Sequence, residues 1–273
     1  MSDSRPVLLA LDTATDRLHL ALTVGEQVRV RDLPGGAEAS ATLLPALAAL
    51  LDEAGLAWAD VDAIGFGCGP GAFTGLRTAC SVAQGLALGL GRPVLVLDTL
   101  MAVAEDARQA SPSAWAPGDT LWVLQDARMD ELYAGAFTWD GVRWAAAQAP
   151  QLWPRDEPLH RWCGMASASA VAAAAAVATP AHTVSVPRWA GNAAHAHPDT
   201  LAPLLPAACL VEGGAPAAPR GAALAALAQQ AWVRGEAVDA ALALPRYVRD
   251  KVAQTTDERR ARAAIAEAPG NRA

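Results

Sequence analysis

The most chemically informative spacing in the chain lies in a glycine-rich segment at residues 67–77, GCGPGAFTGLR. An apolar run precedes it and helical composition follows it, so the segment joins a strand to a helix. Glycine permits positive φ and close backbone approach, and the free N–H groups of a helix N-terminus bind anions. No Gly-Lys-Ser/Thr follows, and the G-x-G-x-x-G fingerprint is incomplete. Two interpretations stay open: a tight turn, or an anion or phosphate loop formed by Asp12, Gly69, Gly71, Thr74 and Gly75.

Acid–base and metal candidates are few. Asp12 and Asp126 each end an apolar run, where a carboxylate either holds a cation through water or caps a turn. His195 and His197 are the only closely spaced histidines, and they lie in a Pro- and Gly-rich stretch that we interpret as an incidental exposed loop. Neither H-E-x-x-H nor G-x-S-x-G occurs. We therefore predict no catalytic residue and no metal site.

A second signal is a helix predicted over residues 40–53, because residues 43–51 carry no charged or polar side chain. A helix that is apolar all round is buried on more than one side, so its second side needs a partner. The next predicted helix, residues 74–90, has small residues at spacings of four, which lets two helices approach closely. The alternative is that an alanine-rich composition makes any helix look apolar. The predicted partner interface consists of Leu43, Leu44, Leu47, Leu50, Leu51, Ala79, Val82, Ala83, Gly85 and Leu86.

The elements that would position these residues follow an α/β order. Apolar runs separated by short polar gaps predict three strands in a meander, at residues 7–13, 18–24 and 27–33. After the first helix come a buried strand at 61–67, the helix at 74–90, a strand at 93–97 and a helix at 99–107. The order β-β-β-α-β-α-β-α is typical of a layered α/β fold.

The chain also contains a repeat. Asp12 and Asp16 recur as Asp126 and Asp130 with the same offset of 114 residues, each time within strand, acidic turn, strand. Two unrelated hairpins would be the alternative. Strands are predicted at 120–126 and 131–138, and helices at 166–178 and 220–234. We predict an N-terminal subdomain at 1–110, a degenerate copy at 111–245 and a basic tail at 246–273, which is either solvated or contacts a partner or RNA.

Composition excludes several classes of function. The 273 residues carry a net charge of −7, so the chain is a poor nucleic-acid binder by itself. A hydrophobic content of 53% excludes disorder for the bulk of the chain. The four cysteines form no C-x-x-C pair, which is typical of buried thiols in a reducing compartment. We expect a cytoplasmic protein that does not enter the membrane.

Four segments together resemble the TsaB family of tRNA threonylcarbamoyladenosine biosynthesis proteins, within the Gcp-like or M22 glycoprotease-like superfamily. Residues 69–77, GPGAFTGLR, are similar to the family signature GPGSFTGLR. Residues 9–15 (LALDTAT) match its opening strand, and residues 126–133 (DARMDELY) match its mid-chain motif. Residues 245–249 (PRYVR) with 251–253 resemble its C-terminal motif.

The resemblance implies an actin-like or Hsp70-like (ribonuclease H-like) fold of duplicated βββαβα subdomains. It also implies a non-catalytic scaffold that supports the catalytic paralogue TsaD and the ATPase TsaE in forming N6-threonylcarbamoyladenosine at tRNA position 37. ATP would be used by the complex, no cofactor would be held by this chain alone, and tRNA would be contacted only indirectly. The two N-terminal-lobe helices would bind the paralogue, and in isolation would form a homodimer.

Two departures and two competing functions stay open. Thr13 and Ala14 stand where kinases of this superfold have glycine after the aspartate, which argues against nucleotide binding by this chain alone. Ala39 and Ala41 stand where many family members have His and Glu. The main alternative function is a small-molecule phosphotransferase, an ATP-binding kinase of the same superfold. A peptidase, as the older superfamily name suggests, is the weaker alternative.

Overall fold

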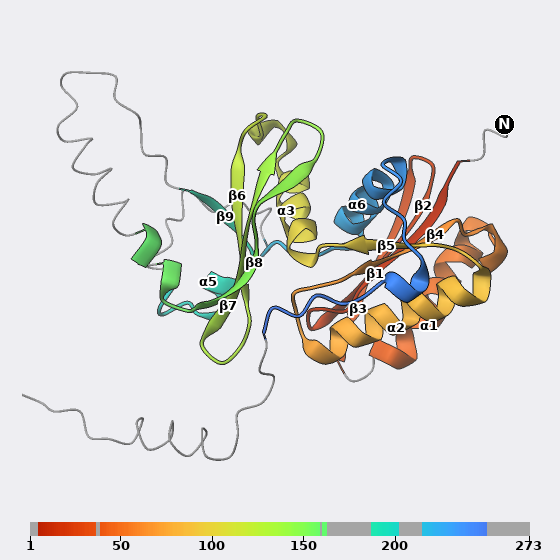
Figure 1. The fold of residues 1–273 in the computed structure, drawn as a ribbon, viewed down its shortest axis with the longest axis horizontal. Coiled ribbons are helices and arrows are strands. Elements are labelled where there is room, and N and C mark those ends of the chain that lie inside the picture. Colours follow the sequence, from red (N-terminus) through yellow and green to blue (C-terminus); the bar gives the residue numbers. More distant parts are fainter. Residues whose placement is uncertain (1–4, 37–38, 159, 163–186, 202–214, 250–273) are drawn as a thin grey trace, which may run out of the picture.

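The computed structural model describes residues 5–36, 39–158, 160–162, 187–201 and 215–249. They form two lobes, each built on its own β-sheet (Figure 1). The predicted helix at 166–178, Cys163, Cys209 and residues 250–273 of the predicted tail lie outside the described residues. Within the described part of the chain, no helix is long and apolar enough to cross a membrane.

The sheet of the first lobe contains β1 (Val7–Asp12), β2 (Arg17–Val24), β3 (Gln27–Pro34), β4 (Ala63–Gly67) and β5 (Val94–Leu97). Its strand order is β3-β2-β1-β4-β5. The first three strands form the predicted antiparallel meander, and β4 and β5 run parallel to β1. All five strands agree with the sequence prediction to within two residues at each end.

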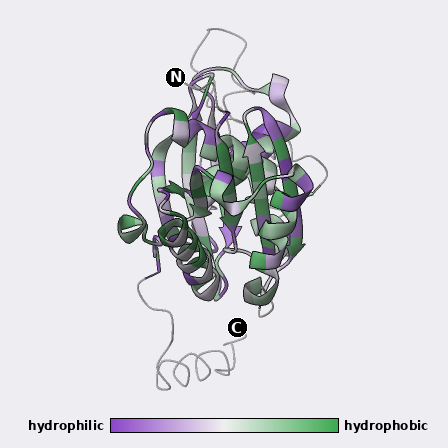
Figure 2. Cartoon of the chain, turned by 90° about the vertical axis from the view of Figure 1, so that its right-hand side faces the viewer, coloured by the Kyte–Doolittle hydropathy of each residue, from purple (hydrophilic) through white to green (hydrophobic). Residues whose placement is uncertain are grey.

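Helices cover both faces of this sheet. The helices α1 (Ala39–Ala54) and α2 (Phe73–Leu90) cover one face, and α6 (Gly221–Val233) covers the other (Figure 1). Alternate residues of β1 divide between the two layers: Leu9 and Leu11 pack with α1 and α2, whereas Leu8 and Ala10 pack with α6. A strand buried on both faces reads as a continuous apolar run, which is how β1 reads in the sequence. Hydrophobic residues accordingly predominate along the strands of the first sheet (Figure 2).

The second lobe repeats the strand order of the first. It contains β6 (Thr120–Asp126), β7 (Glu131–Trp139), β8 (Trp144–Pro154) and β9 (Arg188–Ala190), in the order β8-β7-β6-β9. This order matches β3-β2-β1-β4, with the Asp-bearing turns at equivalent places, and so confirms the repeat. The duplicated arrangement is the actin-like, ribonuclease H-like fold. Sequence reasoning did not predict β8 or β9, because β8 is an alanine- and proline-rich edge strand and β9 has three residues.

The two lobes exchange helices. The helix α3 (Thr99–Ala110) follows β5 of the first lobe but packs on the second sheet, whereas α6 comes from the second half of the chain and packs on the first. These two helices contact each other between the lobes. The predicted boundary near residue 110 falls where the chain leaves α3 and continues through a short 3-10 turn, Pro112–Ala114. The helix α5 (Ala193–Ala196) and the 3-10 turns Trp58–Asp60 and Ala240–Leu242 complete the described elements.

Candidate functional site

The glycine-rich segment joins β4 to α2 and lies against other parts of this chain. A Cβ added at Gly71 would lie 2.5 Å from the Cβ of Ala14, and one at Gly75 would overlap the carbonyl oxygen of Thr13. A Cβ at Gly69, where φ is +109°, would lie 2.8 Å from the carbonyl oxygen of Arg246. Each glycine therefore permits a close approach of the backbone to its own chain.

Asp12 is fully buried beside this segment. Its Oδ1 accepts a hydrogen bond from the Ala14 amide at 2.7 Å, and its Oδ2 accepts one from the Thr99 hydroxyl at 2.8 Å. The Thr99 hydroxyl in turn accepts from the Gly69 amide at 3.0 Å. Burial raises the pKa of Asp12, and the two hydrogen bonds oppose that rise. Asp12 thus connects β1 to α3 and does not face an open site.

The residues predicted as an anion loop do not surround a common open space. Thr74 is the exposed member, in the first turn of α2. The amide of Ala72, at the N-cap position of α2, donates to the carbonyl of Ala14 at 2.8 Å, so this part of the helix N-terminus is already satisfied within the chain. The geometry favours the tight-turn interpretation, and phosphate binding by Asp12, Gly69, Gly71, Thr74 and Gly75 stays a prediction.

Asp126 in the second lobe plays the same local role as Asp12 in the first. Its Oδ1 accepts from the amide two residues ahead, Arg128, at 3.0 Å, as Asp12 accepts from Ala14. Both aspartates thus cap turns, which was one of the two interpretations that the sequence left open. In the described residues, no three His, Cys, Asp or Glu side chains gather as they would around a metal ion.

His197 also lies near this turn, contrary to our interpretation of residues 195–197 as an incidental exposed loop. Its Nε2 lies 3.1 Å from Oδ1 of Asp126, and its side chain is 17% exposed. The side-chain oxygen of Asn192 accepts a hydrogen bond from the backbone amide of Asp126 at 2.7 Å. The pairing was missed because 71 residues separate His197 from Asp126, and no local pattern connects them.

The tip of the β6–β7 hairpin has an unusual backbone. Arg128, Met129 and Asp130 have φ values of 63°, 57° and 60°, although none of them is glycine. Three consecutive left-handed residues with side chains are strained and persist only where surrounding contacts hold them. The sequence offered no signal for this turn, because glycine or asparagine is the residue expected at such positions.

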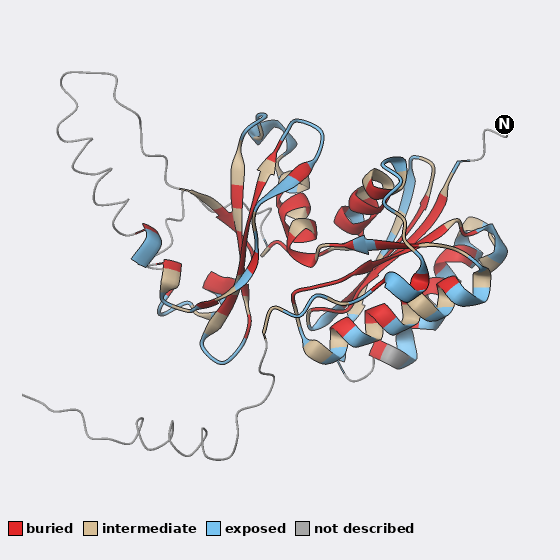
Figure 3. Cartoon of the chain, viewed as in Figure 1, coloured by how far each residue is buried: buried red, intermediate tan, exposed pale blue. Residues whose placement is uncertain are grey.

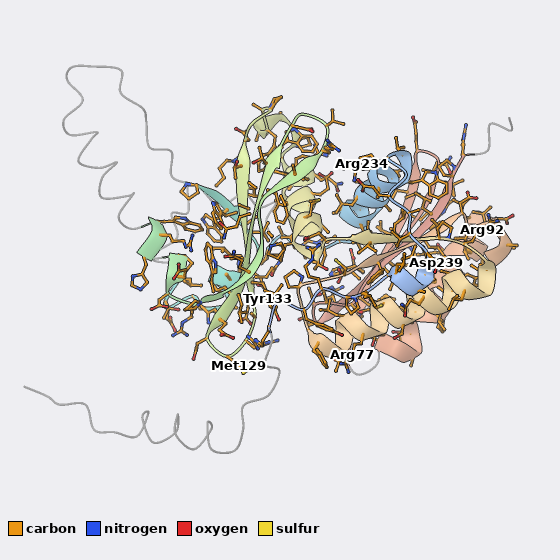
Figure 4. All side chains as sticks on the ribbon, viewed as in Figure 1. Arg77, Arg92, Met129, Tyr133, Arg234 and Asp239 are labelled. Atoms are coloured by element: carbon orange, nitrogen blue, oxygen red, sulfur yellow. The ribbon has the colours of Figure 1, made fainter. Side chains whose placement is uncertain are left out.

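Two neighbouring cavities lie where the hairpin meets the first lobe. The larger, about 310 Å³, is the cleft between the lobes, and its polar lining includes Thr15, Asp16, Gln125, Asp126 and Asn192. The smaller, about 250 Å³, is lined by the start of α2, by the hairpin tip and by residues 246–249. Tyr133 lines both, and its hydroxyl crosses between the lobes to donate to the carbonyl of Gly71 at 3.2 Å (Figure 4).

The predicted partner interface divides between the core and the surface. Leu43, Leu47, Leu50 and Leu51 of α1 are buried in the core of the first lobe. Ala79 and Ala83 of α2 are buried there too. The prediction that these six residues form a partner face is therefore wrong: they face the first sheet and the neighbouring core, because the lobe itself covers that side of both helices.

A different set of residues forms the outer face of α1 and α2 (Figure 3). Leu44 is 44% exposed and Leu88 is 71% exposed. Gly85 and Gly89 have open space where a Cβ would stand. The partly exposed Val82 and Leu86 lie on the same helix. These residues are apolar and few of them are large, and they share the exposed sides of the two helices with polar residues such as Glu53 and Ser81. The sequence prediction included Leu44, Val82, Gly85 and Leu86 among them.

The comparisons with known proteins agree with this architecture. A family model described as TsaD, tRNA N6-adenosine threonylcarbamoyltransferase, matches residues 37–256. A tRNA threonylcarbamoyladenosine biosynthesis protein TsaB from Haemophilus influenzae is 36% identical over 137 residues, which cover 50% of this chain and 56% of that protein. The TsaB protein of Escherichia coli is 33% identical, covering 53% of this chain and 63% of that protein. The matched part is thus less than two thirds of either relative.

A solved structure extends the likeness over both lobes. YeaZ from Pseudomonas aeruginosa is 32% identical with a TM-score of 0.69, covering 89% of this chain and 99% of that one. Two lobes of one strand order, joined by exchanged helices around a cleft, define a protein of the actin-like fold. Within that class, the chain belongs to the TsaB/YeaZ family of the TsaD (Gcp) superfamily.

Proposed function

We propose that this chain is a non-catalytic scaffold subunit in the formation of tRNA N6-threonylcarbamoyladenosine. In this proposal it binds a TsaD-like catalytic paralogue, a TsaE-like ATPase completes the assembly, and the chain itself holds no cofactor. It contacts tRNA only through its partners, in keeping with its net charge of −7. Membership of the TsaB/YeaZ family supports the pathway.

The observation that carries the scaffold role is the outer face of α1 and α2. Leu44 and Leu88 expose apolar side chains there, and Gly85 and Gly89 leave the α2 backbone open to close approach. Close approach of two helices through small residues gains dispersion contacts along the backbone, and exposed leucines gain from removal of water. A second helix pair, from the paralogue or from another copy of this chain, is the partner that we propose for this surface.

The position of Asp12 beside the cleft supports the non-catalytic part of this proposal. In a kinase of this superfold, the first aspartate would have to reach the phosphates or their cation. Here both oxygens of Asp12 are engaged by Ala14 and Thr99, and the carboxyl is fully buried. Calorimetric titration of the isolated chain with Mg-ATP tests the alternative phosphotransferase function; saturable binding would favour that alternative over a scaffold.

Co-purification with the TsaD-like paralogue tests the interface. Leu44→Glu places a charge on the outer face at an exposed position, so the fold should be retained while the paralogue is lost from the complex. Val233→Glu is the matched control, because Val233 is 84% exposed at the end of α6, on the other side of the sheet. Unchanged recovery of the paralogue with Leu44→Glu would refute the interface. Unchanged threonylcarbamoyladenosine in tRNA after depletion of this chain would refute the function.

A further inference from the structure

Residues 245–249, here called the C-terminal strap, leave the first lobe and cross to the second. Before the strap, Val238 pairs with Val94 at the edge of the first sheet. The side-chain amide of Gln84 on α2 donates to the carbonyls of Ala240 and Ala243 at 3.0 and 2.9 Å. The chain is therefore fixed along the first lobe up to the point where the strap begins.

The strap is anchored to the first lobe through Arg246. Its amide donates to the carbonyl of Cys68 at 2.7 Å, directly at the glycine-rich segment. Its guanidinium pairs with Asp98, at the N-cap of α3, with an N–O distance of 2.5 Å. The Arg246 carbonyl lies over Gly69, where a side chain would not fit. Gly69 thus makes room for the strap.

Tyr247 adds a second contact on the same lobe. Its ring packs on Phe73 with the centroids 5.1 Å apart, and its hydroxyl accepts from Nε of Arg77 at 3.2 Å. The Arg77 guanidinium lies 3.8 Å from the centroid of the Phe73 ring. The first turn of α2 and the strap therefore form one packed unit.

Arg249 anchors the strap to the second lobe, at the left-handed tip of the β6–β7 hairpin. Its guanidinium donates to the carbonyls of Ala127 at 2.9 Å and Arg128 at 3.3 Å, and pairs with Glu131 at 2.5 Å. Its side chain is only 13% exposed. All three contacts come from Nη2, whose two hydrogens are shared among three acceptors around a backbone turn that is strained by itself, whereas the buried Nε has no hydrogen-bond partner among the described residues.

From these contacts we infer that the C-terminal strap is an interlobe clamp, which holds the hairpin tip against the glycine-rich segment and fixes the width of the cleft. Arg246 and Tyr247 form the first-lobe end of the clamp, and Arg249 forms the second-lobe end. The inference does not rest on the proposed function, because it concerns contacts within this chain. It corrects our prediction that the tail is solvated or contacts a partner or RNA, as far as residues 246–249 are concerned.

Amide hydrogen exchange of the full chain tests the clamp. The amides of Ala127 and Glu131 form the hydrogen bonds that close the hairpin tip, with Glu131 and Arg128 carbonyls as acceptors. Arg249→Gln should accelerate their exchange by about tenfold or more, because local opening of the hairpin tip then no longer has to break the contacts of Arg249 with Ala127, Arg128 and Glu131. Arg246→Gln should accelerate exchange at the same two amides, although the hydrogen bonds of Arg246 are made to Cys68 and Asp98 of the first lobe.

A matched control separates the clamp from loss of a charge. Arg234→Gln removes an arginine whose side chain, among the described residues, pairs only with Glu236, two residues away. In the Arg234→Gln variant, the amides of Ala127 and Glu131 should exchange at the wild-type rate. The exchange of β1 amides reports whether a variant is folded. Unaltered exchange at the hairpin tip in folded Arg246→Gln, or equal acceleration in Arg234→Gln, would overturn the clamp.

Discussion

Replacing Gly75 by alanine tests whether the glycine-rich segment is shaped by packing within the chain. The added methyl group would overlap the Thr13 carbonyl oxygen, and the approach that Gly75 permits also brings its own carbonyl within 2.6 Å of the Thr13 hydroxyl. Gly85 in the same helix is the natural control, because a Cβ there has nothing within 4 Å.

The expected energies have opposite signs at the two positions. In a helix interior, Gly→Ala stabilises by about 0.5–1 kcal/mol. Gly85→Ala should show this gain. At Gly75, overpacking against the backbone costs about 1–3 kcal/mol, and displacing α2 weakens the Thr13 hydrogen bond by about 1 kcal/mol. The helix-propensity gain offsets only part of this, so the net destabilisation of Gly75→Ala should be about 1–3 kcal/mol.

Urea unfolding followed by tryptophan fluorescence or circular dichroism measures both variants. With a denaturant slope of about 2 kcal/mol/M, Gly75→Ala should lower the midpoint by about 1 M, and Gly85→Ala should raise it slightly. An anion loop predicts another pattern: Gly75→Ala would unfold like Gly85→Ala and differ only in phosphate binding. Equal or greater stability of Gly75→Ala relative to the wild type would therefore refute the packing argument.

Two further predictions follow from buried titratable groups. Burial raises the folded-state pKa of Asp12 above 3.8, so the folded protein loses stability as the pH rises from about 3.8 towards the raised value. The side chain of Asp12→Asn does not titrate, so the difference between its lower urea midpoint and that of the wild type should shrink as the pH rises through this range. A difference that grows with pH would contradict a raised pKa for Asp12. Burial raises the pKa of Cys68 to about 12 and also raises that of Cys80. Mass-mapped alkylation at pH 8 should label both only after unfolding, and rapid labelling in the folded protein would contradict their burial.

The first lobe illustrates how far local patterns reach. The apolar runs at β1, β2 and β4 predicted their strands, because both faces of this sheet are covered and nearly every residue is apolar. The Asp12/Asp126 repeat predicted the duplication, since each aspartate caps a turn through its own neighbouring amide. Such features depend on residues close in sequence, so the sequence alone contains them.

The direction of the helical faces was only half predicted. Nine apolar positions in α1 indicated burial on two sides, yet four of its leucines serve the lobe's own core. The apolar part of the outward side is formed by Leu44 on α1 and by Gly85, Leu88 and Gly89 on α2. An alanine-rich composition weakens the contrast between inner and outer sides, so only the packed sheet identifies which residues a partner could reach.

By itself, the sequence determined the α/β order of the first lobe, the repeat, and the family resemblance carried by residues 69–77 and 126–133. Only the tertiary structure decided what the glycines, His197 and the strap contact. Gly69 meets Arg246, Asp126 meets His197, and Arg249 holds the left-handed tip at Ala127 and Arg128. The physical reason is separation along the chain: these contacts join residues 71 to 177 positions apart, and only the folded chain brings such residues together.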